Sequence, residues 1–281
     1  MPAADIADIS RRINAERIVL LGWLRALLLQ LAHPLIAAGV AEHSSFRGST
    51  RAGFARLHQT VDVMLALTFG APDERAAALD GIRSIHRRVH GSLRAPVGRF
   101  ATGTPYSAED PELLRWVHAT LVESIVLTYD RLVAPLSPGE RDRYCADSAE
   151  VAIALGADAA VTPKTWSQLR SYIDRACDSG QIVVSEDAVV LASALLSPVR
   201  NRYIKPFIAP LVSVLATGQL PPSVRGQYRL PWNRRRARLF ASMFTMLRWF
   251  RRVTPTRVAW WKIARSGSCL RVSDEYSAAT R

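Results

Sequence analysis

Apolar residues recur at helical spacing along most of this chain, and that spacing limits the fold more than any other feature. In residues 51–69 they form one stripe, made of Phe54, Leu57, Val61, Met64, Leu65 and Thr68. The same spacing predicts further helices over residues 73–90, 110–133, 137–156, 162–178, 185–196, 201–217 and 234–251. Only one short β-branched run, Gln181–Val184, would suit a strand, and it is too short to build a sheet. The sequence therefore predicts an all-α fold.

Turn and capping residues divide these helices. Asp73 is placed to cap the start of the helix over residues 73–90, and Gly91 is placed to end it. Residues 92–106 and 218–233 are rich in proline and glycine and lack helical spacing. We expect both of these segments to be irregular.

The N-terminal segment does not have the form of a signal peptide. Ser10-Arg11-Arg12 precedes an apolar run, but acidic residues flank the run and Arg25 interrupts it. The run Ile18–Val40 also contains His33-Pro34, where a helix ends or kinks, so we interpret it as a buried amphipathic helix. We predict a cytoplasmic protein that binds peripherally at the inner face of the membrane.

The net charge of +13 comes from the C-terminal third of the chain. Between Ala188 and Ser273 there are sixteen Lys or Arg residues and no Asp or Glu, whereas residues 1–187 are close to neutral. An anionic membrane, an acidic partner or nucleic acid would each explain such a segment. We divide the chain into a helical domain over residues 10–215 and a basic, aromatic-rich helical tail over residues 216–281.

Arginines alternate with bulky aromatic residues in residues 234–265 of this tail. The aromatic residues are Phe240, Phe244, Trp249, Phe250, Trp260 and Trp261. Such a pattern is typical of an interfacial helix on anionic lipid. Nucleic acid is the rival partner, because arginine and aromatic side chains also bind single strands. No RRM, KH or helix-turn-helix signature accompanies the pattern, so we favour the membrane surface.

Sequence motifs of several enzyme classes are absent. The chain has no GxGxxG, P-loop, GxSxG or HExxH motif, which disfavours dinucleotide enzymes, P-loop NTPases, serine hydrolases and zincin proteases. Three widely spaced cysteines, Cys145, Cys177 and Cys269, form no CxxC pair and no even disulfide set. Because CxxCH is also absent, any haem would be bound without a covalent link.

All six histidines fall within residues 33–118, and histidine is the commonest metal ligand in proteins. His86 and His90 are one turn apart on the predicted helix and could chelate a metal ion, although neighbouring arginines disfavour a bare dication. His86 alone lies near the apolar side of that helix, which suits an axial haem ligand. The alternative for His86 is a core histidine whose ring is satisfied by hydrogen bonds.

Several other polar residues could serve the same site. Arg56 and Thr60 share a helix face and could hold an anionic group such as a haem propionate, or could belong to a surface helix. His33 and His43 could line a pocket or mark helix ends, and His118 could flank a ligand or pack in the core. The acidic residues Asp62 and Glu123 lie in apolar helical stretches, where a carboxylate can act as a base or hold a histidine ring. No ExxH pair occurs, which argues against a ferritin-like di-iron bundle.

A set of short motifs occurs in order over roughly residues 20–180, and together they resemble the latex-clearing-protein and MpaB-type oxygenase family. The motifs are His33-Pro34, Gly39-Val40, His43-Ser44, Arg56-x-x-x-Thr60, Phe69-Gly70, Ile82-Arg83-x-x-His86-x-x-Val89-x-Gly91, Tyr106-x-Ala108-x-Asp110-Pro111 and Trp116-Val117-His118. The resemblance implies a globin-like helical core that binds a b-type haem and uses dioxygen to oxidise apolar, often isoprenoid, substrates.

The resemblance also assigns roles to residues. His86 corresponds to the axial histidine, and Arg56 and Thr60 correspond to the family's arginine and threonine near the haem. Gln59 stands where latex-clearing proteins have a distal lysine, and His90 stands where relatives have arginine, so rubber itself is a doubtful substrate.

From these observations we predict three catalytic residues, Arg56, Thr60 and His43. We predict a cofactor site made of His86, Arg56, Thr60 and His118, in which His86 is the metal ligand. The predicted function is a haem b-dependent oxygenase that acts on an apolar, isoprenoid or lipid substrate at a membrane surface. The alternative is a non-catalytic helical protein that binds lipid or protein and retains a degenerate haem site.

Overall fold

The computed structural model describes residues 9–43, 50–196, 203 and 205–266, and in these ranges helices joined by loops make up the protein, with only two short strands beside them. The all-α prediction is therefore confirmed. The N-terminal half contains α1 (Ile9–Ala15), the 3-10 turn η2 (Arg17–Val19), α2 (Leu20–Leu31), α3 (Pro34–His43), α4 (Thr50–Phe69), α5 (Pro72–His86), β1 (His90–Ser92), β2 (Pro105–Ser107) and α6 (Pro111–Leu132). The rest contains α7 (Pro138–Ala154), α8 (Trp166–Asp178), α9 (Glu186–Leu196), α10 (Lys205–Gln219), α11 (Pro222–Gln227), α12 (Arg234–Val253), α13 (Thr256–Ala259) and α14 (Lys262–Ser266).

Local capping explains where several of these helices begin. The Asp110 carboxylate accepts a hydrogen bond from the backbone N–H of Glu112 at 2.8 Å, at the start of α6. Ser137 and Glu140 form a reciprocal capping box at the start of α7. At the start of α12, the Asn233 side chain accepts a hydrogen bond from the backbone N–H of Arg236 at 3.0 Å. Each cap uses residues that are adjacent in the sequence, so the predicted helix starts lie close to the observed ones.

Two predicted segments are different in the structure, and the one run that would suit a strand does not form one. The helix predicted over residues 73–90 ends at His86, because the chain turns there and residues 90–92 pair with β2 as an antiparallel strand. Residues 218–233 are not wholly irregular, since they contain α11. The run Gln181–Val184 is not a strand, because its backbone pairs with the side chain of Gln227 instead of with another strand.

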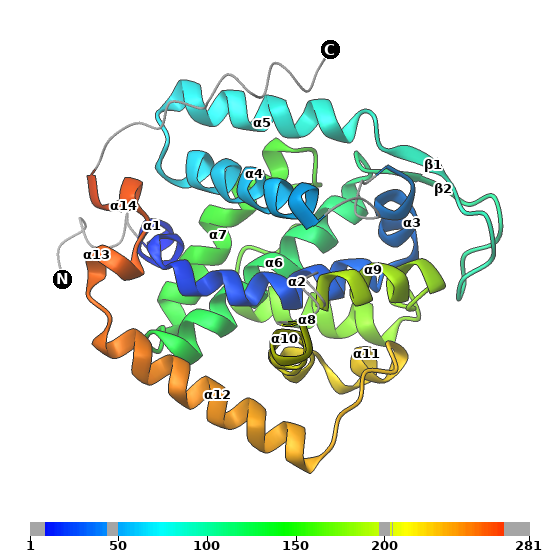
Figure 1. The fold of residues 1–281 in the computed structure, drawn as a ribbon. Helices are drawn as coiled ribbons and strands as arrows, with labels where there is room; N and C mark the ends of the chain where they lie inside the picture. Colours follow the sequence, from blue (N-terminus) through cyan, green and yellow to red (C-terminus); the bar gives the residue numbers. More distant parts are fainter. Residues whose placement is uncertain (1–8, 44–49, 197–202, 204, 267–281) are drawn as a thin grey trace.

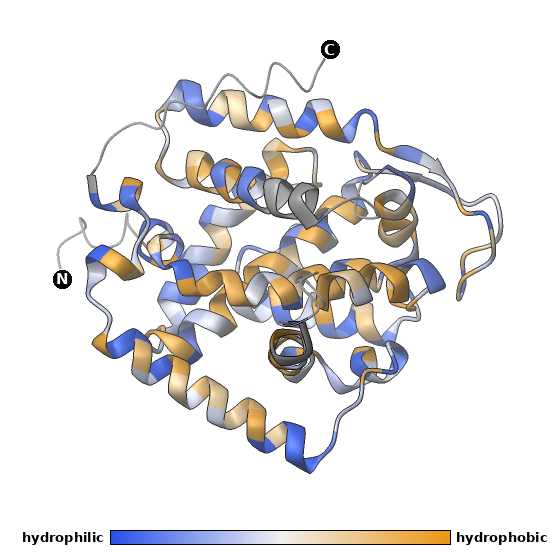
Figure 2. Ribbon diagram, viewed as in Figure 1, coloured by the Kyte–Doolittle hydropathy of each residue, from blue (hydrophilic) through white to orange (hydrophobic). Residues whose placement is uncertain are grey.

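The centre of the molecule is the contact between α2 and α6, which lie across each other in the middle of Figure 1. Both helices are largely buried, and α2 is apolar over most of its length (Figure 2). A Cβ atom on Gly22 would lie 2.5 Å from the backbone oxygen of Ser124, so the two backbones touch at this point. The indole N–H of Trp116 donates to the backbone oxygen of Leu29 at 3.2 Å.

A buried ion cluster crosses this central contact. The Glu123 carboxylate on α6 is fully buried and pairs with Arg25 of α2 at 2.6 Å and with Arg170 of α8. The Arg25 guanidinium also donates to the Ser124 hydroxyl and to the backbone oxygen of Gln219. We interpreted Glu123 as a base or a histidine partner, and that interpretation is wrong because two arginines bind its carboxylate. Arg25, which interrupts the apolar run in the sequence, is the central helix's buried partner for that carboxylate.

The remaining helices surround this centre. The pair α4 and α5 lies along one side, while α12 lies on the opposite side in Figure 1 and packs on α6 and α10. The hairpin of β1 and β2 packs on α3. The division into a domain at residues 10–215 and a tail at residues 216–281 stays a prediction.

The kink expected at His33-Pro34 is present. The segments Arg17–Leu31 and Pro34–His43 meet there at an angle of 104°. This bent pair is apolar enough for a bilayer only when both parts are taken together, and no single helix of the described ranges meets that criterion.

Replacing Gly22 with alanine tests the central contact. The new methyl group would overlap backbone atoms of α6, so we expect Gly22→Ala to lower the free energy of unfolding by roughly 1–3 kcal/mol. Gly139→Ala is the matched control, because nothing lies within 4 Å of its added Cβ, and its stability should be unchanged or higher by up to about 1 kcal/mol. Urea unfolding of the two variants measures both values. Equal stabilities would show that α2 and α6 are not in close contact.

Candidate cofactor site

The helical hairpin of α4 and α5 carries most of the residues predicted to bind a cofactor. The two helices are joined by Gly70 and Ala71 and run antiparallel, side by side (Figure 1). From Pro72 to His86, α5 rises by about 21 Å, and the same distance back from Phe69 reaches about residue 55 of α4. The His86 end of α5 is therefore level with the turn of α4 that holds Arg56 and Thr60.

The structure describes Arg56 and Thr60 of α4 in different detail. Arg56 lies on α4, and its side chain is outside the described residues. Thr60 follows one turn later, and its side chain is exposed. The structure thus brings their backbone positions near the His86 end of α5.

His86 is the last residue of α5, and its side chain is half-buried. Burial lowers the pKa of the imidazole, against an opposing effect of the Glu109 charge. A lowered pKa keeps the ring neutral at physiological pH, which is the form that coordinates a metal. The predicted chelate with His90 is wrong in its geometry, because His90 lies in β1 and not on the same helix face.

The segment that follows α5 is hydrogen-bonded to the segment that leads into α6 and to α3. The backbone N–H of Ala108 donates to the carbonyl of Val89 at 2.8 Å, and this hydrogen bond joins the two ends of the β-hairpin formed by β1 and β2. From α3, the Nε2 atom of His43 lies 3.0 Å from the carbonyl oxygen of His90. The exposed ring of His43, predicted as catalytic, thus holds the hairpin against α3 in this structure.

A second contact between α3 and the hairpin was not found in the sequence. The Glu42 carboxylate accepts hydrogen bonds from the Tyr106 hydroxyl and from the guanidinium of Arg94. These hydrogen bonds lower the pKa of Glu42, and burial together with that bond raises the pKa of Tyr106. The three residues lie far apart in the chain and share no periodic spacing, so no local signal points to their contact.

Among the residues that the structure describes, two histidines have a buried ring nitrogen with no hydrogen-bond partner. They are His33, at the bend between α2 and α3, and His118, on α6, with the unpartnered atoms Nδ1 and Nε2 respectively. Burial lowers the pKa of His118 to about 4, and burial with the nearby Arg99 charge does the same for His33. Buried polar atoms without a hydrogen-bond partner are uncommon in folded proteins. Each of these two nitrogens therefore indicates either a group that binds to it or a strained local structure.

The donor set determines what kind of metal site fits. Within the described ranges, no three His, Cys, Asp or Glu residues are grouped closely enough to hold a metal ion. A bare ion needs three or four protein ligands. Porphyrin iron needs only one, because the macrocycle supplies four nitrogens. A neutral, half-buried His86 fits a haem. The Nε2 atom of His118, on α6, has no hydrogen-bond partner among the described residues and can bond a polar group.

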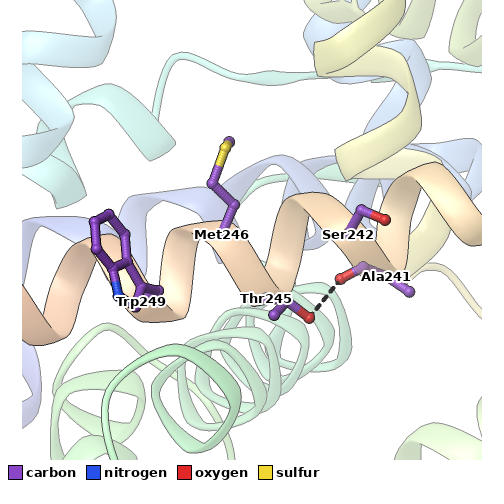
Figure 3. Close-up of a pocket in the computed structure, with 5 residues that line it drawn as sticks. All are labelled: Ala241, Ser242, Thr245, Met246 and Trp249. Atoms are coloured by element: carbon purple, nitrogen blue, oxygen red, sulfur yellow. Dashed lines mark hydrogen bonds between the residues drawn. The ribbon is translucent and has the colours of Figure 1, made fainter.

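Asp62 and a depression along α12 contribute nothing to this group of residues. Asp62 is exposed on α4, so it does not provide a buried carboxylate. A shallow, open depression lies along α12, lined by Ala241, Ser242, Thr245, Met246 and Trp249 (Figure 3). None of the six histidines lines it, and it is not the cofactor site.

The two buried histidines predict a loss of stability in acid. Their folded pKa is about 4, below the ordinary value of 6.5, so the unfolded chain binds more protons between pH 6.5 and pH 4. The free energy of unfolding should therefore fall as pH falls through that range and level off below about pH 4. At pH 5 each imidazole should cost roughly 2 kcal/mol relative to pH 7.

Urea unfolding of the cofactor-free protein at pH 7 and pH 5 measures this loss. His118→Leu should reduce the difference between the two pH values, whereas His58→Leu, at an exposed position on α4, should leave it unchanged. An identical pH dependence in His118→Leu and the unaltered protein would contradict the burial of that ring.

One comparison with known proteins gives a match. The sequence model of the family described as "ER-bound oxygenase mpaB/B'/Rubber oxygenase, catalytic domain" matches residues 10–249. The match begins in α1, ends within α12 and includes all six histidines. No curated protein and no solved structure matches the chain.

Proposed function

Because the chain belongs to the mpaB/rubber oxygenase catalytic-domain family and is thus an oxygenase, we propose that it works with a b-type haem whose iron is bound by His86. The observation that carries this proposal is the state of His86. Its ring is half-buried, its pKa is lowered, and it lies at the end of α5, level with the turn of Arg56 and Thr60. A neutral imidazole in that place supplies the one protein ligand that porphyrin iron needs.

The other residues of the site would orient the haem. Arg56 and Thr60 are one turn apart on α4, and a guanidinium and a hydroxyl at that spacing suit a propionate, which is a planar anionic acceptor. His118 would donate to, or accept from, a polar group that enters the protein, since its Nε2 atom has no partner within the described residues. When bound, the haem would supply the chemistry with dioxygen, while the protein supplies the ligand, the orientation and the exclusion of water.

The proposed substrate is an apolar molecule of the isoprenoid or lipid class. The side chains of α2 and of the inner face of α6 are mostly apolar and buried, so this part of the protein excludes water. A greasy substrate is poorly soluble in water and is delivered most readily from a membrane. We therefore propose that the enzyme acts in the cytoplasm, peripherally at the inner face of the membrane.

Replacing His86 tests the haem assignment. The purified protein supplied with hemin should show a Soret band and bind about one haem per chain. His86→Ala should lose the band or shift it strongly, because the iron loses its protein ligand. His90→Ala is the matched control at an exposed position four residues away, and it should keep the wild-type spectrum.

The spectra also separate the outcomes. Full haem binding with a wild-type spectrum in His86→Ala would show that another residue is the ligand. An unaltered protein that stays colourless with hemin would support the alternative, a non-catalytic lipid- or protein-binding chain with a degenerate site.

A further inference from the structure

The basic helix α12 has three stripes of side chains along its length. Positions three, four and seven residues apart lie on one face of a helix, so each stripe can be followed in the sequence. The inner stripe is half-buried and consists of Arg236, Ala237, Phe240, Met243, Phe244, Leu247 and Arg251. Two exposed stripes remain, one apolar and one basic.

The inner stripe fastens α12 to the body of the protein. Phe240 packs directly against the backbone of Gly218 on α10, where an added Cβ would lie 2.3 Å from its ring. At the other end, the Arg251 guanidinium donates to the buried Glu16 carboxylate, with Nε at 2.6 Å. Glu16 also accepts from the indole N–H of Trp260 at 2.7 Å. These contacts fix which side of α12 faces outward.

The outer apolar stripe consists of five large side chains that stay exposed. They are Leu239, Met246, Trp249, Phe250 and Val253, with exposed fractions between 41% and 62%. Met246 and Trp249 project from the same side of the helix in Figure 3 and line the shallow depression there. Exposed apolar side chains that are contiguous in this way mark an interaction surface rather than ordinary surface scatter.

The outer basic stripe runs beside the apolar one. It consists of Arg234, Arg238, Arg248 and Arg252, which are all exposed. No acidic residue occurs between Ala188 and Ser273, so α12 itself carries no charge of the opposite sign. The outer surface of α12 therefore presents the outer apolar stripe and the outer basic stripe side by side.

We propose that α12 is the membrane-docking helix of this protein and lies in the plane of an anionic phospholipid surface. The stripe of Leu239, Met246, Trp249, Phe250 and Val253 enters the boundary between head groups and acyl chains, and the basic stripe binds lipid phosphates. This arrangement is that of an interfacial helix, whose affinity combines apolar burial with attraction to anionic lipid. The inference specifies the membrane part of the proposed function and does not use the haem part.

The composition of the outer surface favours a bilayer over two other occupants. A second copy of α12 would bring two rows of arginine together with no acidic residue between them, which costs electrostatic energy. Single-stranded nucleic acid would use the cations and the rings of Trp249 and Phe250 for stacking, but would leave Leu239, Met246 and Val253 in water. Only a lipid surface uses both stripes along their full length.

Vesicle co-sedimentation of the full chain tests this proposal. The protein should bind phosphatidylcholine vesicles that contain phosphatidylglycerol far more strongly than pure phosphatidylcholine vesicles, and less as salt is raised. Replacing Arg238, Arg248 and Arg252 with glutamine should lower the partition coefficient on the order of a hundredfold at low salt. The matched control replaces three exposed arginines elsewhere, Arg75, Arg131 and Arg175, and should reduce binding much less.

A second pair of variants tests the apolar stripe. The triple variant M246S/W249S/F250S should lose most vesicle binding, including the part that persists at high salt. Its control, V189S/V190S, removes exposed apolar side chains from α9 and should keep binding. In the unaltered protein the tryptophan emission should shift to the blue on vesicles, and this shift should shrink in Trp249→Phe.

Several results would overturn the proposal. Equal loss of vesicle binding in the α12 variants and their controls would show that the net charge or the total exposed apolar surface of the protein, and not α12, causes the binding. Tighter binding to an oligonucleotide than to vesicles would assign α12 to nucleic acid, and α12-dependent dimers by sedimentation would assign it to a second copy. A wild-type Soret band in every α12 variant keeps these outcomes separate from any failure of the haem proposal.

Discussion

The buried carboxylate of Glu123 is the interaction on which the arrangement of helices depends most. Its side chain has no exposure, and it is paired with Arg25 from α2 and Arg170 from α8. Burying Glu123 and Arg25 is costly, and their attraction offsets that cost only when α2 and α6 hold one geometry. The side chain of Arg170 is 40% exposed and is a partly solvated second partner of the same carboxylate. Direct contact of the α2 and α6 backbones at Gly22 adds a second restriction in the same place. The position of α6 is thereby set for everything that packs around it.

The candidate cofactor site follows from that position. The carbonyl oxygen of Val89, three residues after His86, accepts a hydrogen bond from the backbone N–H of Ala108 in the segment that leads into α6, so the position of α6 restrains the chain just after His86. The hairpin of β1 and β2 is held against α3 by His43 and Glu42 from one side. These contacts lie next to His86, whose half-buried ring has a pKa that burial lowers. The site is thus built on rigid helices rather than on loops.

A second buried carboxylate, Glu16, fixes the orientation of α12 on the protein, as Glu123 fixes the position of α6. Its bonds to Arg251 and Trp260 turn one face of α12 toward the protein. The other faces then have no partner among the described residues that would cover Trp249 and Phe250, and both stay exposed. One chain thus combines an oxygenase-family domain with an outer helix that exposes basic and apolar side chains, and this combination is the basis of the proposed membrane docking.

The sequence by itself determined the helical class, several helix starts and the family, because apolar spacing, the caps at Asp110 and Ser137 and the ordered motifs are all local patterns. It also singled out His86 through a motif, and the role of that residue as the haem ligand stays a prediction. Only the tertiary structure decided that His90 leaves the helix for a strand, that Glu123 is bound by two arginines, and that α12 exposes one apolar stripe. Each of these outcomes depends on contacts between residues far apart in the chain, and such contacts leave no periodic trace in the residues that make them.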